Sequence, residues 1–242
     1  INEAIQTAKT TSKPVHLNFP FREPLYKTVP QAEKEVRKIE YVGTSKQISN
    51  DQFQSLLKRW NKFQKKMIVC GSLNPDDELN NIISKLHQRQ DVCILSESTS
   101  NIYGDHIISC IDRTLERIYG RPEFLPELVM TIGNSIISKK LKKLFRKYNP
   151  VEHWHIEDTN RAQDVFSSLT AFLPIEPKNF LKQLTSHVEN TKEENEFQKL
   201  WKKEDLIASK NHAVFEKSCI WSDLKAHYIL QKYLKDNFII QM

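Results

Sequence analysis

Short apolar runs alternate with amphipathic segments through the middle of the chain. One amphipathic segment carries Phe53, Leu56, Leu57 and Trp60 at a spacing close to 3.6 residues, which is typical of a helix with one buried face. The apolar runs have the length of buried strands and lie at residues 67–70, 92–95, 128–132, 153–156 and 168–172, with a weaker run at 106–109. This alternation predicts an α/β domain, a Rossmann-like parallel sheet of about six strands with helices on both faces.

The two ends of the chain differ from this middle part. Residues 1–10 are helix-like, and residues 15–19 alternate before Pro20, which predicts a strand that ends a preceding unit. Polar residues between Arg22 and Asn50 show little periodicity and predict a linker. From residue 176 onward, helical patterns that include Phe197 and Trp201 predict a long exposed amphipathic rod. The apolar run 238–242 predicts the first strand of a further domain, so we expect a piece of a longer protein.

Composition narrows the class of protein. The hydrophobic share is 39% and the charged share 27%, as in ordinary globular proteins. No apolar run approaches the ~18 residues that span a bilayer, and the first residues lack a secretion signal, so we expect a cytoplasmic protein without membrane contacts. The cysteines Cys70, Cys93, Cys110 and Cys219 lie far apart in apolar contexts, which predicts buried free thiols. The net charge of +6 only weakly favours an anionic partner.

Two loops begin where a sheet of this kind holds its ligand. Residues 70–76 follow the first central strand, and residues 132–135 follow the fourth. In the usual strand order these strands are neighbours at the point where the order reverses, and the diverging loops leave a crevice there. Neither loop contains G-x-G-x-x-G, so we expect no NAD or FAD.

The second loop leads into a helix with a basic start. Ser138 can cap this helix, so that Lys139 and Lys140 become its first two residues. Cations there oppose the helix dipole at a cost of a few tenths to ~1 kcal/mol, which a bound anion would offset. The lysine pair is therefore a candidate carboxylate site. The alternative, which the helix wheel alone favours, is a solvated face of Lys139, Lys140, Lys142, Lys143, Arg146 and Lys147 opposite a dry face of Ile137, Leu141, Leu144, Phe145 and Tyr148.

Other polar clusters favour structural roles. His153 and His155 would point to the same face of a strand, at the spacing of a metal pair, but no third ligand lies nearby. We expect this pair to satisfy local hydrogen bonds. Glu157, Asp158 and Asp164 could serve as acid, base or ribose contacts, yet no nucleophile is near them in sequence, so surface or capping roles are favoured.

Three segments resemble one family of enzymes. They are the string Pro-Val-His-Leu-Asn-Phe-Pro-Phe-Arg-Glu-Pro-Leu-Tyr at residues 14–26, the loop at residues 133–140, and Glu-His-Trp-His-Ile at residues 152–156. They are similar to the 2-succinyl-5-enolpyruvyl-6-hydroxy-3-cyclohexene-1-carboxylate synthases of menaquinone biosynthesis. The resemblance implies that residues 1–28 end a pyrimidine-binding domain, 29–50 form a linker, 51–190 form the central Rossmann-like domain, and 191–242 hold a helical connection and the first strand of a pyrophosphate-binding domain.

The resemblance also implies a chemistry. Members of this family are transferases that use thiamine diphosphate and a divalent metal, Mg²⁺ or Mn²⁺, to decarboxylate 2-oxoglutarate and add the succinyl unit to isochorismate. Both substrates are acids, so the resemblance implies that Lys139 and Lys140, with Ser135 and Asn134 of the same loop, hold their carboxylates. With the resemblance included, this role outweighs the solvated-face alternative.

The family's cofactor-activating Glu and its diphosphate and metal motif lie outside this chain. The resemblance therefore implies that the chain holds no catalytic, cofactor or metal residues, is inactive alone, and forms a homo-oligomer when complete. The alternative is a basic Rossmann-like binding or scaffold module without a catalytic role. Nucleic-acid binding is disfavoured, because Phe145 and Tyr148 fall on the dry face of the basic helix.

Overall fold

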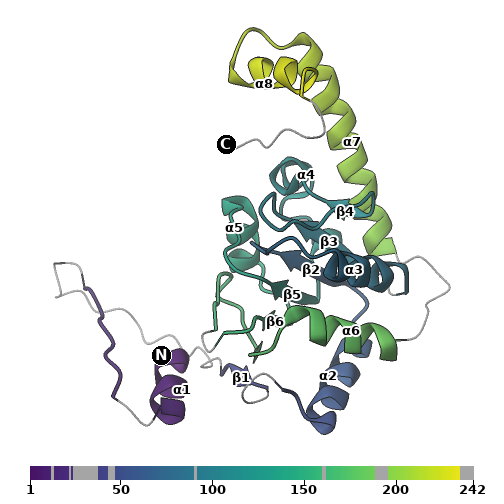
Figure 1. The fold of residues 1–242 in the computed structure, drawn as a ribbon. Coiled ribbons are helices and arrows are strands. Elements are labelled where there is room, and N and C mark those ends of the chain that lie inside the picture. Colours follow the sequence, from purple (N-terminus) through teal and green to yellow (C-terminus); the bar gives the residue numbers. More distant parts are fainter. Residues whose placement is uncertain are drawn as a thin grey trace.

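Uninterrupted apolar runs form the middle of the sheet, because strands covered by helices on both faces bury every side chain. The computed structural model describes residues 1–11, 14–21, 23, 38–42, 47–89, 92–159, 162–188 and 196–234. Seven strands form one sheet in which every neighbouring pair is parallel (Figure 1). From edge to edge they are β1 (Glu40–Tyr41), β7 (Ala171–Leu173), β6 (Glu152–Ile156), β5 (Leu128–Ile132), β2 (Lys66–Cys70), β3 (Val92–Ser96) and β4 (Ile107–Ile108).

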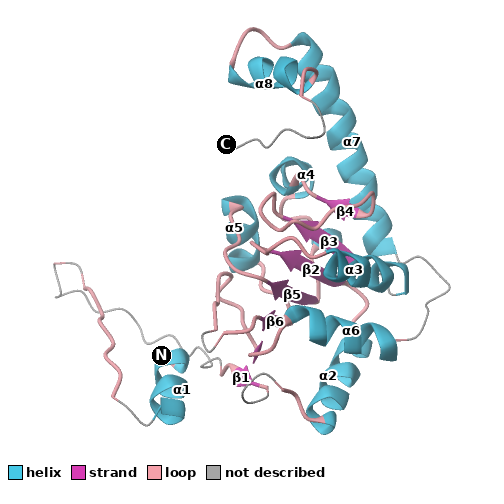
Figure 2. Cartoon of the chain, viewed as in Figure 1, coloured by secondary structure: helices cyan, strands magenta, loops and turns pink. Residues whose placement is uncertain are grey.

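Helices cover both faces of this sheet, so the predicted α/β class is confirmed (Figure 2). The helices α2 (Asn50–Lys62), α3 (Asp77–Arg89) and α6 (Pro177–His187) share one buried cluster with one face of the strands. On the opposite face lie α4 (Ile111–Ile118), α5 (Lys139–Lys147) and the first part of α7 (Glu196–Ser218). The remaining helices are α1 (Asn2–Thr11), the short 3₁₀ helix η1 (Pro122–Phe124) and α8 (Asp223–Gln231).

The edge of the sheet differs from the predicted pattern. The strand predicted at 168–172 is β7, three residues long, because the Asp164 carboxylate accepts hydrogen bonds from the backbone N–H groups of Ser168 and Leu169 and holds a turn there. The seventh strand, β1, lies inside the predicted linker and pairs with β7. A two-residue strand is too short to show a period, so the pattern could not predict it.

The strand predicted at residues 15–19 is wrong. The structure gives residues 14–20 no regular secondary structure and leaves them exposed. Alternation reports only that the two sides of a segment differ, whereas a strand also needs a neighbour to take its backbone hydrogen bonds. The helix at the start of the chain is confirmed as α1. The predicted strand at 238–242 lies outside the described residues.

The predicted exposed rod is wrong for the beginning of α7. Phe197 and Trp201 are buried in the cluster that the sheet shares with α4 and α5. Trp201 Nε1 donates a hydrogen bond 3.2 Å long to the Phe124 carbonyl. The later part of α7 extends away from the sheet and carries α8 at its far end (Figure 1). Exposed apolar residues lie there, with Trp221 77% exposed. No helix in the described ranges is long and apolar enough to cross a membrane.

The contrast between Trp221 and the other three tryptophans can be measured. Trp60, Trp154 and Trp201 are fully buried, so acrylamide should quench mainly the fluorescence of Trp221. We expect Trp221→Phe to remove most of the quenchable emission while leaving the far-ultraviolet circular dichroism unchanged. If acrylamide quenched the fluorescence of the variant as strongly as that of the original protein, another tryptophan would have to be exposed.

Candidate functional site

The strand order reverses between β2 and β5, as the sequence predicts, but the loops that leave them do not diverge. Gly71 N–H donates to the Ile132 carbonyl at 2.9 Å, and Asn134 N–H donates to the Ser72 carbonyl at 2.9 Å. Ser72 N–H in turn donates to the Ser135 carbonyl at 3.2 Å. The expected crevice is therefore closed at this point by backbone hydrogen bonds between the two loops.

Two glycines allow this close approach. A Cβ on Gly71 would lie 2.1 Å from the Asn134 carbonyl oxygen, well inside any real contact. Gly133 has a φ of 73°, which favours glycine, and a Cβ there would meet the Ser72 carbonyl oxygen at 2.7 Å. These glycines join one loop to the other instead of cradling a pyrophosphate.

Helix α5 begins as the sequence predicts. Ser138 is its N-cap, and the Ser138 hydroxyl oxygen accepts a hydrogen bond from Leu141 N–H at 3.0 Å. Lys139 and Lys140 are consequently its first two residues, and the first turn contains no acidic residue. Two cations therefore lie at the helix end where the dipole is positive, which is electrostatically unfavourable.

The chain places its own carboxylate at this helix start. Glu97, which directly follows β3, is 9% exposed, and its Oε1 accepts hydrogen bonds from Ile137 N–H at 3.0 Å and Ser138 N–H at 2.8 Å. The Ser138 hydroxyl donates to Asp112 of α4. A carboxylate of the chain itself thus binds the backbone directly before the helix. Neither carboxylate was predicted, because each is brought in from a distant part of the sequence.

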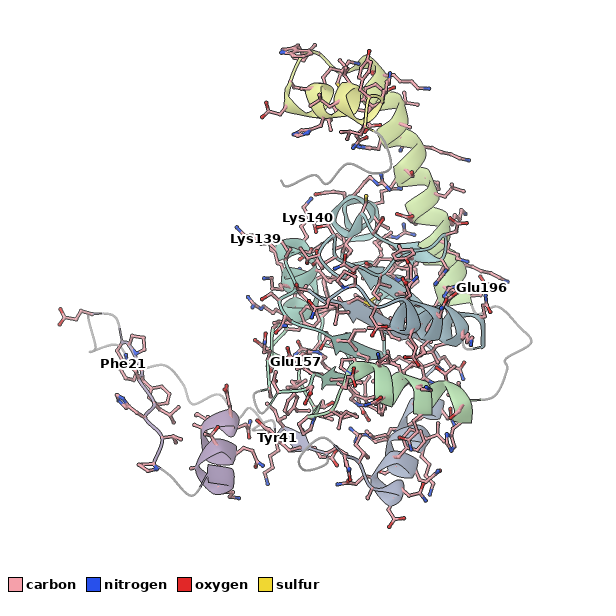
Figure 3. All side chains as sticks on the ribbon, viewed as in Figure 1. Phe21, Tyr41, Lys139, Lys140, Glu157 and Glu196 are labelled. Atoms are coloured by element: carbon pink, nitrogen blue, oxygen red, sulfur yellow. The ribbon has the colours of Figure 1, made fainter. Side chains whose placement is uncertain are left out.

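The predicted site residues follow the carboxyl end of the central strand β5. Lys139 is exposed, and Lys140 forms an ion pair with Glu116 of α4; Figure 3 labels both lysines, side by side at the start of α5. Asn134 and Ser135 are exposed in the loop before them. The four residues thus lie in one loop and the first turn of the helix that follows it, and their role in holding substrate stays a prediction.

The two faces of α5 largely follow the helix wheel. Leu141, Leu144 and Phe145 are buried. Ile137 was predicted on the dry face but is 54% exposed, and Ile136 is buried in its place. The reason is that Ile137 precedes the N-cap, where the backbone is not helical, so the helical period does not apply to it.

A cleft of about 350 Å³ opens beside the start of α5. Its walls come from the end of β3, the first turn of α4 and the loop before α5, and they contain both internal carboxylates. The lining residues are Glu97, Ser98, Ser109, Cys110, Ile111, Asp112, Arg113, Ile137 and Ser138. Lys139 follows directly on this lining, so the lysine pair begins at the border of the cleft.

Known proteins resemble the chain over most of its length. No family model matches it. A protein of Flavobacterium psychrophilum named 2-succinyl-5-enolpyruvyl-6-hydroxy-3-cyclohexene-1-carboxylate synthase is 36% identical over 197 residues, which are 81% of this chain and 35% of that protein. Synthases of the same name from Flavobacterium johnsoniae and Porphyromonas gingivalis are 35% and 29% identical over 78% and 97% of this chain. The resemblance to these synthases is confirmed.

The chain spans about a third of the length of the two Flavobacterium synthases, 34% and 35%. It covers 42% of the Porphyromonas protein. The activity, substrates and partners of a whole synthase therefore stay predictions for this chain. The domain boundaries at residues 28, 50 and 190 also stay predictions.

The two histidines of β6 belong to a buried hydrogen-bond chain. Thr131 Oγ1 lies 3.0 Å from His153 Nε2 and 2.9 Å from His155 Nδ1, and the outer ring nitrogens lie 3.1 Å from Ser168 Oγ and 3.2 Å from Glu157 Oε2. One set of tautomers satisfies every contact, with each group donating to the next from Ser168 to Glu157.

Both ring nitrogens of each histidine are engaged in this chain, which supports the structural role predicted for the pair. A metal bound by the two histidines would have to displace Thr131, Ser168 or Glu157. Within the described residues, no group of three or more His, Cys, Asp or Glu side chains could hold a metal ion.

The cysteines do not share one environment. Cys70 and Cys93 are buried in the strands, and burial raises the pKa of the Cys70 thiol to about 12. Cys110 is exposed, which corrects the prediction of four buried thiols, and Cys219 is partly exposed. Cys110 directly precedes α4 and lines the cleft, whereas its apolar neighbour Ile111 is 3% exposed.

The contact between the two loops predicts that one added methyl group at Gly71 lowers the stability of the fold. Gly71→Ala should lower the free energy of unfolding by about 1–3 kcal/mol, because the new Cβ has to displace the Asn134 backbone. Urea unfolding measures this change. Asn74→Ala, an exposed substitution in the same loop, is the control and should change stability by less than about 0.5 kcal/mol. Equal stabilities would show that the loops are not in contact.

The thiols predict a pattern of alkylation. Iodoacetamide at pH 8 should label Cys110 in the folded chain, whereas Cys70 should react only after denaturation, since it is buried and its thiolate form is suppressed. Peptide mass spectrometry before and after unfolding gives the labelled positions. Rapid labelling of Cys70 under native conditions would contradict the packing of β2.

Proposed function

We propose that the chain is the central part of a thiamine-diphosphate-dependent transferase, a carboligase of menaquinone biosynthesis that works in the cytoplasm. The complete enzyme would decarboxylate 2-oxoglutarate and add the succinyl unit to isochorismate. What carries this proposal is the similarity to curated synthases over 78–97% of the chain. The confirmed α/β fold agrees with the central domain that the resemblance implies.

The contribution of this chain would be to hold carboxylates. Lys139 and Lys140 lie together at an edge of the sheet, with Asn134 and Ser135 in the preceding loop. Lys139 is exposed and makes no ion pair with the described residues, and its ammonium can therefore meet a substrate carboxylate in a charge-assisted hydrogen bond. Lys140 would have to exchange Glu116 for the substrate, or share its ammonium between them.

We expect no thiamine diphosphate, Mg²⁺ or Mn²⁺ to bind the described residues by themselves. The two loops at the strand reversal, where a sheet of this kind usually holds its ligand, are joined by backbone hydrogen bonds. We therefore assign the cofactor to the part of the complete enzyme outside this sequence, and expect this chain alone to be inactive. We also propose that the complete enzyme is a homo-oligomer.

A second candidate is a scaffold without substrate contacts. It is favoured by the observation that Glu97 and Asp112 already supply the negative charge at the start of α5. In this case the lysines would be ordinary solvated residues, and removing them would leave the reaction unchanged.

The complete enzyme tests both candidates. With thiamine diphosphate and Mg²⁺ it should release CO₂ from 2-oxoglutarate in the presence of isochorismate, and Lys139→Ala/Lys140→Ala should raise the KM of one acid about tenfold or more, or lower kcat. Lys142→Ala/Lys143→Ala is the matched control, since it removes the same charge from the same helix. Absence of CO₂ release would reject the synthase, and normal kinetics of the first double variant would favour the scaffold.

A further inference from the structure

Glu97 connects distant parts of the sheet. Its strand, β3, is separated from β5 by β2, yet its side chain binds the backbone of the loop that follows β5. A single oxygen accepts both N–H groups, from Ile137 and Ser138, and the Glu97 residue is 9% exposed. Hydrogen bonds to a charged acceptor in such surroundings are stronger than neutral ones, so this carboxylate fixes the end of the loop.

Helix α4 holds the same point from the other side. Ser138 donates its hydroxyl to Asp112, and Lys140 pairs with Glu116, which lies one turn further along α4. The Ser138 backbone is thus bound by Glu97, and the Ser138 side chain by Asp112. The residue immediately before Lys139 has little freedom to move.

Glu97 limits where an anionic ligand from solvent can bind near the start of α5. An anion arriving from solvent at the start of α5 would have to compete with a carboxylate that is already bound to the two N–H groups. The lysine side chains follow directly after these two N–H groups and can meet a substrate carboxylate without displacing Glu97. The position of those side chains depends on where the loop ends and the helix begins.

We propose that Glu97 is a positioning residue: its carboxylate occupies the start of α5 and thereby sets where Lys139 and Lys140 meet the substrate. This inference rests on the proposed carboxylate-binding function. Glu97 itself touches no substrate and takes part in no bond-making step.

Amide hydrogen exchange in the complete enzyme tests the geometric half of this inference. Glu97→Ala should speed exchange at Ile137 and Ser138 about tenfold or more, because both N–H groups lose their acceptor. Glu97→Gln keeps the length of the side chain and one acceptor oxygen, so it should retain most of the protection against exchange. Glu123→Gln, a carboxylate of η1 that pairs with Arg121, is the control for a general loss of stability. Unchanged exchange in Glu97→Ala overturns the proposal.

A double-mutant cycle tests the functional half. In the complete enzyme, Glu97→Ala should raise the KM of the acid that the lysines hold about tenfold with a smaller effect on kcat, and Glu97→Gln should restore most of the affinity. In the Lys139→Ala/Lys140→Ala background, Glu97→Ala should add little, since there is nothing left to position. Fully additive effects would show that Glu97 acts independently of the lysines and would overturn the proposal.

The outcomes also separate this inference from the proposed function. If the lysine variant raises KM while Glu97→Ala changes neither KM nor exchange, the lysines bind substrate but Glu97 does not position them. If Glu97→Ala releases the loop while the lysine variant reacts normally, the carboxylate-binding function fails and the positioning role falls with it.

Discussion

The backbone contact between the loops that follow β2 and β5 is the constraint on which the rest of the site depends. Parallel strands deliver both loops to the same edge of the sheet, and Gly71 and Gly133 let them approach until their main chains share hydrogen bonds. A sheet of this class usually opens a ligand crevice there. Here the loops are joined, and a cleft opens beside them between the first turn of α4 and the start of α5.

Charge at that point is balanced by contacts between distant elements. Lys139 and Lys140 oppose the dipole of α5, and Glu97 and Asp112 supply the compensating negative charge from β3 and α4. The balance explains why the helix can begin with two cations without an external anion. Glu97 binds the backbone and Asp112 the Ser138 hydroxyl, while the Lys139 side chain is exposed and that of Lys140 is partly exposed.

The described residues supply cations, a cleft and a rigid loop, but no group of three metal-binding side chains. The curated synthases that resemble the chain are about three times as long as the segment they share with it.

The sequence by itself determined the α/β class, the middle strands, the Ser138 cap and the place of the lysine pair, because each depends on residues close together in the chain. It missed β1, the buried beginning of α7 and the carboxylate at the start of α5. Those features depend on which elements become neighbours. Residue pairs such as Glu97 and Ser138 are 41 positions apart, and only the folded sheet decides that they meet.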